Sequence, residues 1–302
     1  MKLCRCHLAI WMCLSLFTGP ALGQNHSLDE SIKLGAEAKK QKQWSQAEQY
    51  FETAVQLSEK LKDGDTRKVV ALTQLALVEQ EQTKQDEAET HATQAVLALN
   101  KCRKANKPRG QGEEFLQIQV SFRVYKDMGY IFFANQKYPE AEKLYQQAVS
   151  ILQDVARPVT NPQSNDDFIQ FLAQEISGIE VELADLYGNL GQVQLRQQRL
   201  KKAQEMYSKA LEIKERKLGK THPDTAILTL NLAIVHAMQK QYDKAGPLFQ
   251  QAVTTLEQTH LTNRPVLVQA YANYARFLEE SGLHTEAEHV LAKAREIQKN
   301  LR

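Results

Sequence analysis

The sequence predicts an all-α protein, a right-handed α-solenoid of about six helix–turn–helix hairpins. The first observation behind this prediction is a repeated spacing, in which a glycine is followed by alanine after 12 residues, an aromatic residue after 16 and alanine after 19. The glycines are Gly35, Gly129 and Gly191. The second is that three more segments keep the alanines of this spacing and begin with alanine, at Ala76, Ala233 and Ala275. The third is an apolar stripe at every third or fourth residue of 168–190, which predicts a long helix.

The repeated spacing has a physical explanation. Small side chains at one place in the first helix and two places in the second allow antiparallel helices to approach closely. A ring then fills the remaining gap, as we expect for Phe51 and Tyr207. Because overpacking such a contact costs about 1–3 kcal/mol, larger residues are disfavoured at the small positions.

This pattern resembles the tetratricopeptide repeat family, whose units stack into a superhelix with a concave binding face. The resemblance covers nearly all of the chain after residue 23. The units it implies span residues 28–61, 69–102, 122–155, 184–217, 226–259 and 268–301. Positions are counted below from the first residue of each unit, so that Gly191 is at position 8 of unit four.

Units four to six also resemble the repeat subclass of kinesin light chains, whose period of 42 residues separates their first residues 184, 226 and 268. The likeness includes the connector Leu218–Thr225, where Gly219 can end one helix and Pro223 can begin the next. It is partial in unit six, which has Asn263–Pro265 instead of the His-Pro-Asp of the connector. The resemblance concerns the repeats alone, because the kinesin coiled coil is missing.

The N-terminal segment 1–23 has the features of a secretory signal peptide. It combines two basic residues with an apolar run over 8–17 and small residues up to Gly23. About ten apolar residues are too few to span a bilayer as a helix, which needs roughly 20. We therefore expect cleavage after Gly23, export to the periplasm or the external medium, and no membrane span afterwards. The alternative is an uncleaved membrane anchor.

Two insertions between the repeats are expected to be loops. Residues 103–114 contain four basic residues, one proline and two glycines, and residues 156–167 contain two prolines among several polar residues. After the second insertion, the apolar stripe predicts a helix from Asp167 to about Gln197 that continues into the first helix of unit four.

Composition and motifs exclude several classes of function. Without the two basic residues of the leader the chain has as many acidic as basic residues, so we do not expect it to bind nucleic acid. Cys102 alone remains after the leader, so it is either buried at a helix end or the site of an intermolecular bridge. Residues 219–221 lack the upstream glycine of a phosphate-binding loop, and His284 and His289 have the wrong spacing for a shared zinc ion. We therefore expect no enzymatic activity, cofactor or metal.

The strongest candidates for a binding role are the asparagines at position 6 of units four, five and six. They are Asn189, Asn231 and Asn273. In the repeat architecture the first helix of each hairpin lines the concave face, and one amide can pair with both the N–H and the C=O of an extended peptide. The kinesin light chain resemblance implies that these positions grip the backbone of a bound peptide. The alternative is that each asparagine ties neighbouring helices together.

Charged and apolar side chains are expected to surround this row of asparagines. The expected concave-face residues are Arg196 in unit four, Leu230, Ile234 and Met238 in unit five, Arg276 in unit six, and Arg123, Lys126, Tyr130 and Phe133 in unit three. Guanidinium groups beside an apolar strip favour a peptide with a carboxylate near a hydrophobic anchor. The alternative for each charge is an ordinary solvated surface.

These observations predict a monomeric, non-enzymatic scaffold that binds an extended segment of a protein or peptide partner in its concave groove. The polar outer side of the last helix, 286–301, favours a monomer because it can cap the solenoid. The alternative function is a structural spacer or assembly subunit of the cell envelope that uses its convex face.

Overall fold

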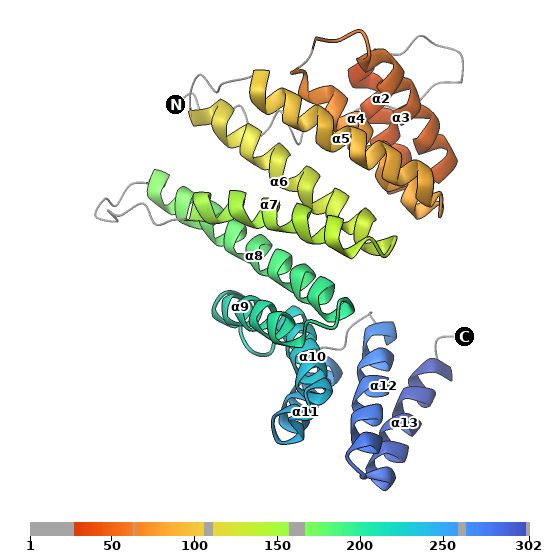
Figure 1. The fold of residues 1–302 in the computed structure, drawn as a ribbon, viewed down its shortest axis with the longest axis vertical. Coiled ribbons are helices and arrows are strands. Elements are labelled where there is room, and N and C mark those ends of the chain that lie inside the picture. The colour runs from red at the N-terminus through yellow and green to blue at the C-terminus, as the bar shows by residue number, and fades with distance from the viewer. Residues whose placement is uncertain (1–26, 63, 106–110, 157–166, 259–263, 300–302) are drawn as a thin grey trace. The chain divides into compact units, whose positions relative to one another are not determined.

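The computed structural model describes residues 27–62, 64–105, 111–156, 167–258 and 264–299. Within these ranges it contains twelve α-helices and no strand, so the predicted all-α fold of six hairpins is confirmed (Figure 1). The expected leader, residues 1–23, lies outside the described residues. The six hairpins are α2 (Leu28–Lys40) with α3 (Trp44–Ser58), α4 (Thr66–Glu81) with α5 (Gln85–Ala105), α6 (Gln111–Ala134) with α7 (Tyr138–Ala156), α8 (Asp167–Arg196) with α9 (Leu200–Leu218), α10 (Pro223–Met238) with α11 (Tyr242–Gln258), and α12 (Arg264–Glu280) with α13 (His284–Lys299).

The chain divides into two compact units, an N-terminal unit of Met1–Ala148 and a C-terminal unit of Val149–Arg302. In the N-terminal unit α2 packs on α3, α3 on α4, α4 on α5 and α5 on α6. In the C-terminal unit the same succession runs from α8 to α13. Within each unit, successive hairpins therefore pack on one another, which is the arrangement of a solenoid.

The small residues of the repeated spacing lie where the two helices of a hairpin approach each other. A Cβ atom added to Gly35 would lie 2.7 Å from the ring of Phe51, one added to Gly129 2.8 Å from Tyr145, and one added to Gly191 2.7 Å from Tyr207. The two alanines of the spacing are fully buried in the first five hairpins, and in the sixth Ala287 is fully buried while Ala294 is 6% exposed. The predicted role of the spacing is thus confirmed, because only hydrogen fits above the ring in these three hairpins.

Each hairpin turns through three residues, and the middle one has a left-handed backbone. Five of these residues are not glycine and have φ between 57° and 62°: Lys42, Thr83, Gln136, Gln198 and Lys240. The sixth is Gly282, with φ of 79°. In every turn the next residue donates its N–H to a carbonyl five residues back, as Lys84 does to Glu79 at 2.9 Å. This is the Schellman ending of a helix, which usually takes glycine at the left-handed residue.

Thr83 is the least suitable of these turn residues, because a β-branched side chain is strained at its φ of 62°. Replacing Thr83 by glycine is expected to raise the free energy of unfolding by about 1 kcal/mol. Chemical denaturation of the two proteins measures the change. Lys42→Gly is the matched control, because lysine is not β-branched and the gain there should be smaller. Equal gains, or a loss at Thr83, would contradict this explanation.

The expected insertions require one correction. The prediction of a loop over 103–114 is wrong at both ends, because α5 continues to Ala105 and α6 already begins at Gln111. A physical reason for the early start is that Glu113 and Glu114 are favourable in the first turn of a helix, near the positive end of its dipole. Residues 157–166 of the second insertion lie outside the described residues. The long helix expected from Asp167 to about Gln197 is confirmed as α8, which ends at Arg196.

Two further observations concern the surface and the core. Cys102 is buried near the end of α5, which agrees with the first of its two expected placements. In the described part of the chain, every helix is too short or too polar to cross a membrane.

Candidate functional site

The candidate site is the set of position-6 asparagines on α8, α10 and α12, all in the C-terminal unit. The connector before α10 fixes the register of the central one. Gly219 ends α9 with φ of 89°, the His222 side chain accepts a hydrogen bond from the N–H of Asp224 at 3.2 Å, and Pro223 begins the helix. Thr225 donates from its hydroxyl to the Gly219 carbonyl at 2.9 Å. Asn231 therefore follows a well-defined helix start.

The side chains of Asn189 and Asn231 are only partly buried, although the residues after them, Leu190 and Leu232, belong to the core. Within the part of the chain that the structure describes, neither amide forms a hydrogen bond with another residue. Both amides keep a donor and an acceptor that can be used by a ligand.

Asn273 differs from the other two asparagines. Its Oδ1 accepts hydrogen bonds from Nε2 of Gln269 and from Nη2 of Arg276, each at 3.3 Å. Both partners are on α12, the helix of Asn273 itself. Among the described residues, none of the three amides forms a hydrogen bond to a different helix. Such a bond is what the alternative of a structural tie would require.

Tyrosines at position 4 form hydrogen bonds that join neighbouring hairpins. Tyr125 donates its hydroxyl to Oδ1 of Asn100 at 3.1 Å, Gln153 donates from Nε2 to the hydroxyl of Tyr187 at 2.6 Å, and Tyr271 donates to Glu257. Each polar partner is at position 32 of the preceding unit. Burial together with this hydrogen bond raises the pKa of Tyr271. The sequence prediction missed these ties, although tyrosine recurs at position 4 of units three, four and six.

Two arginines accompany the asparagines in the C-terminal unit. Arg196, near the end of α8, and Arg276 on α12 are exposed. Burial raises the pKa of Tyr207, and the charge of Arg196 opposes this rise. The contact of Arg276 with Asn273 places one guanidinium group directly beside an amide of the candidate site.

The expected apolar strip of unit five requires a correction. Leu230 is buried, and Ile234 is partly buried against the same hydrophobic core of α10 to α13. Leu230 is therefore not available to a ligand in the way that we expected, whereas Ile234 remains partly exposed. Met238 does face solvent, with 49% of its surface exposed.

The two basic residues expected in unit three lie on α6, in the N-terminal unit. Arg123 is exposed. The ammonium group of Lys126 lies 5.4 Å from the centre of the Phe122 ring, a cation–π contact within its own helix. Both residues therefore belong to a different unit from the three asparagines.

Over the described ranges no three His, Cys, Asp or Glu side chains are grouped closely enough to hold a metal ion.

Comparison with known proteins agrees with these observations. The sequence profile of the tetratricopeptide repeat family matches residues 182–258 and 226–300. Human tetratricopeptide repeat protein 19, mitochondrial, is 34% identical over 92 residues, which are 30% of this chain and 23% of that protein. The chain thus matches only about a quarter of the length of this relative.

Several solved structures share the fold. BtubC (BKLC) from P. vanneervenii has a TM-score of 0.59 at 16% identity, covering 92% of this chain and 93% of its own. A putative kinesin light chain from Podosopora anserina has a TM-score of 0.53 at 18% identity, with coverage of 79% and 100%. For Pseudomonas aeruginosa pilF the TM-score is 0.53 at 17% identity, with 91% of both chains covered. These likenesses show that the fold is a tetratricopeptide-type α-solenoid.

Proposed function

From the match of residues 182–300 to tetratricopeptide repeats, we propose that the chain is a non-enzymatic scaffold whose C-terminal unit binds an extended segment of another protein. The observation that carries the proposal is that the amides of Asn189 and Asn231 have free hydrogen-bonding capacity within the described residues. They recur at one position of successive hairpins, are partly exposed, and have no hydrogen-bond partner within the described residues. An amide of this kind can pair with a peptide backbone whatever the side chains of that peptide are.

The neighbouring residues favour a particular kind of segment. The exposed guanidinium groups of Arg196 and Arg276 suit a carboxylate, with which arginine forms two parallel hydrogen bonds. The exposed thioether of Met238 suits an apolar side chain. We therefore infer that the segment combines an extended backbone with an acidic residue and one hydrophobic anchor. Arg123 and Lys126 are candidate contacts for a second stretch of the same partner.

We also propose that the chain is exported, since segment 1–23 has the features of a signal peptide, and that it is a monomer, because its first and last hairpins are polar. Positions 3 and 10 are buried and apolar in units two to five, as Leu186 and Val193 show. In unit two these residues are Ala71 and Val78, which pack against the first hairpin. In the first hairpin these positions hold Glu30 and Glu37. At the other end, the residues of α13 that are buried are Ala287 and Ala294, and most of its charged residues are exposed.

The proposed role of the asparagines is tested on residues 24–302, which contain all the described helices. A binding peptide is first selected from a random library of acidic and apolar 12-residue peptides, and its affinity is measured by calorimetry. Changing Asn189, Asn231 and Asn273 together to alanine should weaken binding about 10–1,000-fold, because about one net hydrogen bond of 0.5–1.5 kcal/mol is lost at each. The melting temperature should stay the same.

The matched control is Asn100→Ala. Asn100 accepts a hydrogen bond from the hydroxyl of Tyr125, so its loss should lower the melting temperature and leave the affinity unchanged. Unchanged binding by the triple variant would contradict the proposal. A large fall in its melting temperature would show that the asparagines are structural ties, and would favour the second candidate function, a spacer or assembly subunit of the cell envelope.

A further inference from the structure

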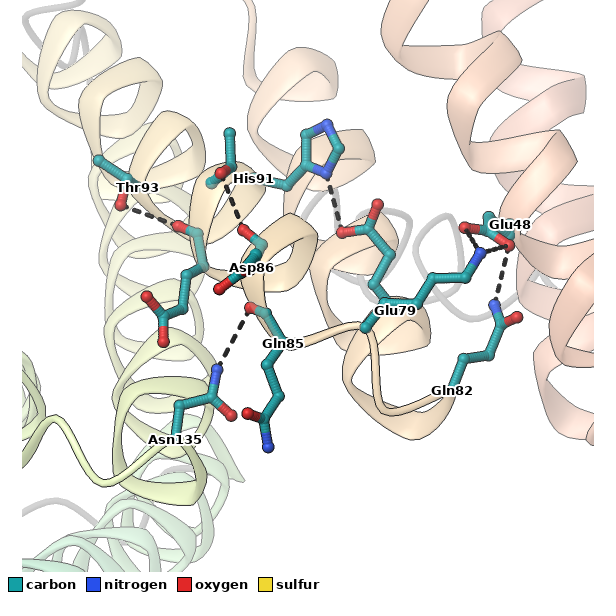
Figure 2. Close-up of polar contacts among 11 residues, drawn as sticks. Glu48, Glu79, Gln82, Gln85, Asp86, His91, Thr93 and Asn135 are labelled. Atoms are coloured by element: carbon teal, nitrogen blue, oxygen red, sulfur yellow. Dashed lines mark hydrogen bonds and ion pairs between the residues drawn. The ribbon is translucent and has the colours of Figure 1, made fainter.

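A buried acid and a histidine pair between the two helices of the second hairpin. Glu79, near the end of α4, has only 3% of its side chain exposed, and Nδ1 of His91 on α5 lies 2.8 Å from its Oε2 (Figure 2). The imidazole is 26% exposed, so a proton can reach it from solvent. This pair is separate from the asparagines of the candidate site, which are in the other unit.

The imidazole of His91 is the ion-pair partner of Glu79 among the described residues. Lys84, in the turn between α4 and α5, donates to Oε1 of Glu48 at 2.5 Å. Gln82 donates to Oε2 of Glu48 at 3.0 Å (Figure 2). The ammonium group of Lys84 is thereby committed to α3. Among the described residues, no side chain other than His91 forms an ion pair with Glu79.

Further carboxylates act on the imidazole from the helices packed around it. Glu48 and Glu52 on α3 and Glu87 on α5 interact electrostatically with His91, in addition to Glu79 on α4. The ammonium group of Lys84 is attracted by Glu48, Glu79 and Glu52. An excess of negative charge therefore surrounds His91 and favours its protonated form.

The hydrogen bond that His91 donates to Glu79 raises the pKa of His91, although burial acts to lower it, and the attraction of Glu79, Glu52 and Glu87 adds to the rise. A group whose pKa is higher in the folded than in the unfolded protein stabilises the fold fully at pH values below its unfolded pKa, which is about 6.5 for histidine. This stabilisation is lost as the pH rises through the higher, folded pKa. Above it, Glu79 is a buried carboxylate that has lost its ion-pair partner, and only the more distant charge of Lys84 still acts on it.

We propose that the proton on His91 is a switch that holds the second hairpin closed in acid to neutral solution and loosens it in alkaline solution. Loss of the proton leaves the Glu79 charge buried, and water reaches it most easily if α5 separates locally from α4. The opening involves α4 and α5, which also pack on α3 and α6. The asparagine face of the C-terminal unit does not take part in it, so this inference is independent of the proposed function.

The direct test is an NMR titration of the histidine side chains in residues 24–302. The His91 imidazole should titrate above pH 6.5, and its titration should move to lower pH in Glu79→Gln. This measurement needs only the wild-type protein for its main result. Titration of His91 at or below pH 6.5 would overturn the proposal.

Hydrogen exchange followed by mass spectrometry tests the opening itself. After correction for intrinsic rates, exchange of Gln85–Ala105 should accelerate about tenfold for each unit by which the His91 pKa exceeds 6.5, as the pH rises from 6 to 9. Exchange of α10 and α11 should not change. In His91→Lys, which keeps its charge throughout this range, the acceleration should disappear.

His284→Gln is the matched control, because His284 lies 2.6 Å from Glu279 but both side chains are exposed. Its effect on exchange should not depend on pH, since water screens an exposed pair. A wild-type protein in which α4 and α5 exchange equally at all pH values would also overturn the proposal.

Discussion

Replacing Phe249 by alanine is expected to lower the free energy of unfolding by about 3–5 kcal/mol, the usual cost of removing a buried aromatic side chain. Phe249 is 1% exposed and fills the gap between the two helices of the fifth hairpin. The centre of its ring lies 5.0 Å from that of Phe277 and 5.6 Å from that of Tyr274. Its loss would leave a cavity between hairpins five and six that these two rings cannot close.

The matched control for Phe249→Ala is Leu291→Ala. Leu291 has the same position in the sixth hairpin but is only partly buried, so its loss should cost about 1 kcal/mol. Urea denaturation followed by circular dichroism measures both changes. Similar costs at the two positions would show that the ring is not what holds neighbouring hairpins together.

Replacing Gly191 by alanine is expected to lower the free energy of unfolding by about 1–3 kcal/mol, the cost of overpacking a close contact. The added Cβ would lie 2.7 Å from two ring atoms of Tyr207. That ring is fully buried and cannot move aside without disturbing α9. The intrinsic preference of alanine for helices acts in the opposite direction, so the net loss measures the tightness of the contact.

Gly178 offers a control on the same helix, because a Cβ added there would meet no atom within 4 Å. Gly178→Ala should therefore raise the free energy of unfolding by about 0.5–1 kcal/mol. Thermal and chemical denaturation of the two variants gives the comparison. Stabilisation by both changes would refute the explanation of the repeated spacing.

The sequence predicted the packing of the hairpins well because the repeated positions are limited by size alone. Gly35, Gly129 and Gly191 each lie above the ring that the spacing assigns to them. The start of α6 was predicted poorly, because glycine and proline near Gly110 suggested a loop while the acidic residues that follow favour a helix. Local composition did not decide between the two.

Features that depend on contacts between helices could not be predicted from the sequence. A threonine at position 83 does not by itself indicate a left-handed backbone. The Schellman hydrogen bonds at the end of α4 impose this conformation. The pairing of Glu79 with His91 likewise depends on how α4 packs on α5. For the candidate site, the sequence identified the asparagines, but only the structure showed that Leu230 is part of the core.

The central claim is that amides of the C-terminal unit hold the backbone of a bound segment. A double-mutant cycle tests it most directly, combining Asn231→Ala with methylation of one backbone nitrogen at a time in the selected peptide. We predict that at one peptide nitrogen methylation weakens binding to the wild type at least tenfold, and that this loss largely disappears in Asn231→Ala. Losses that simply add at every nitrogen would contradict the account, because they would show that the amide and the peptide backbone do not interact.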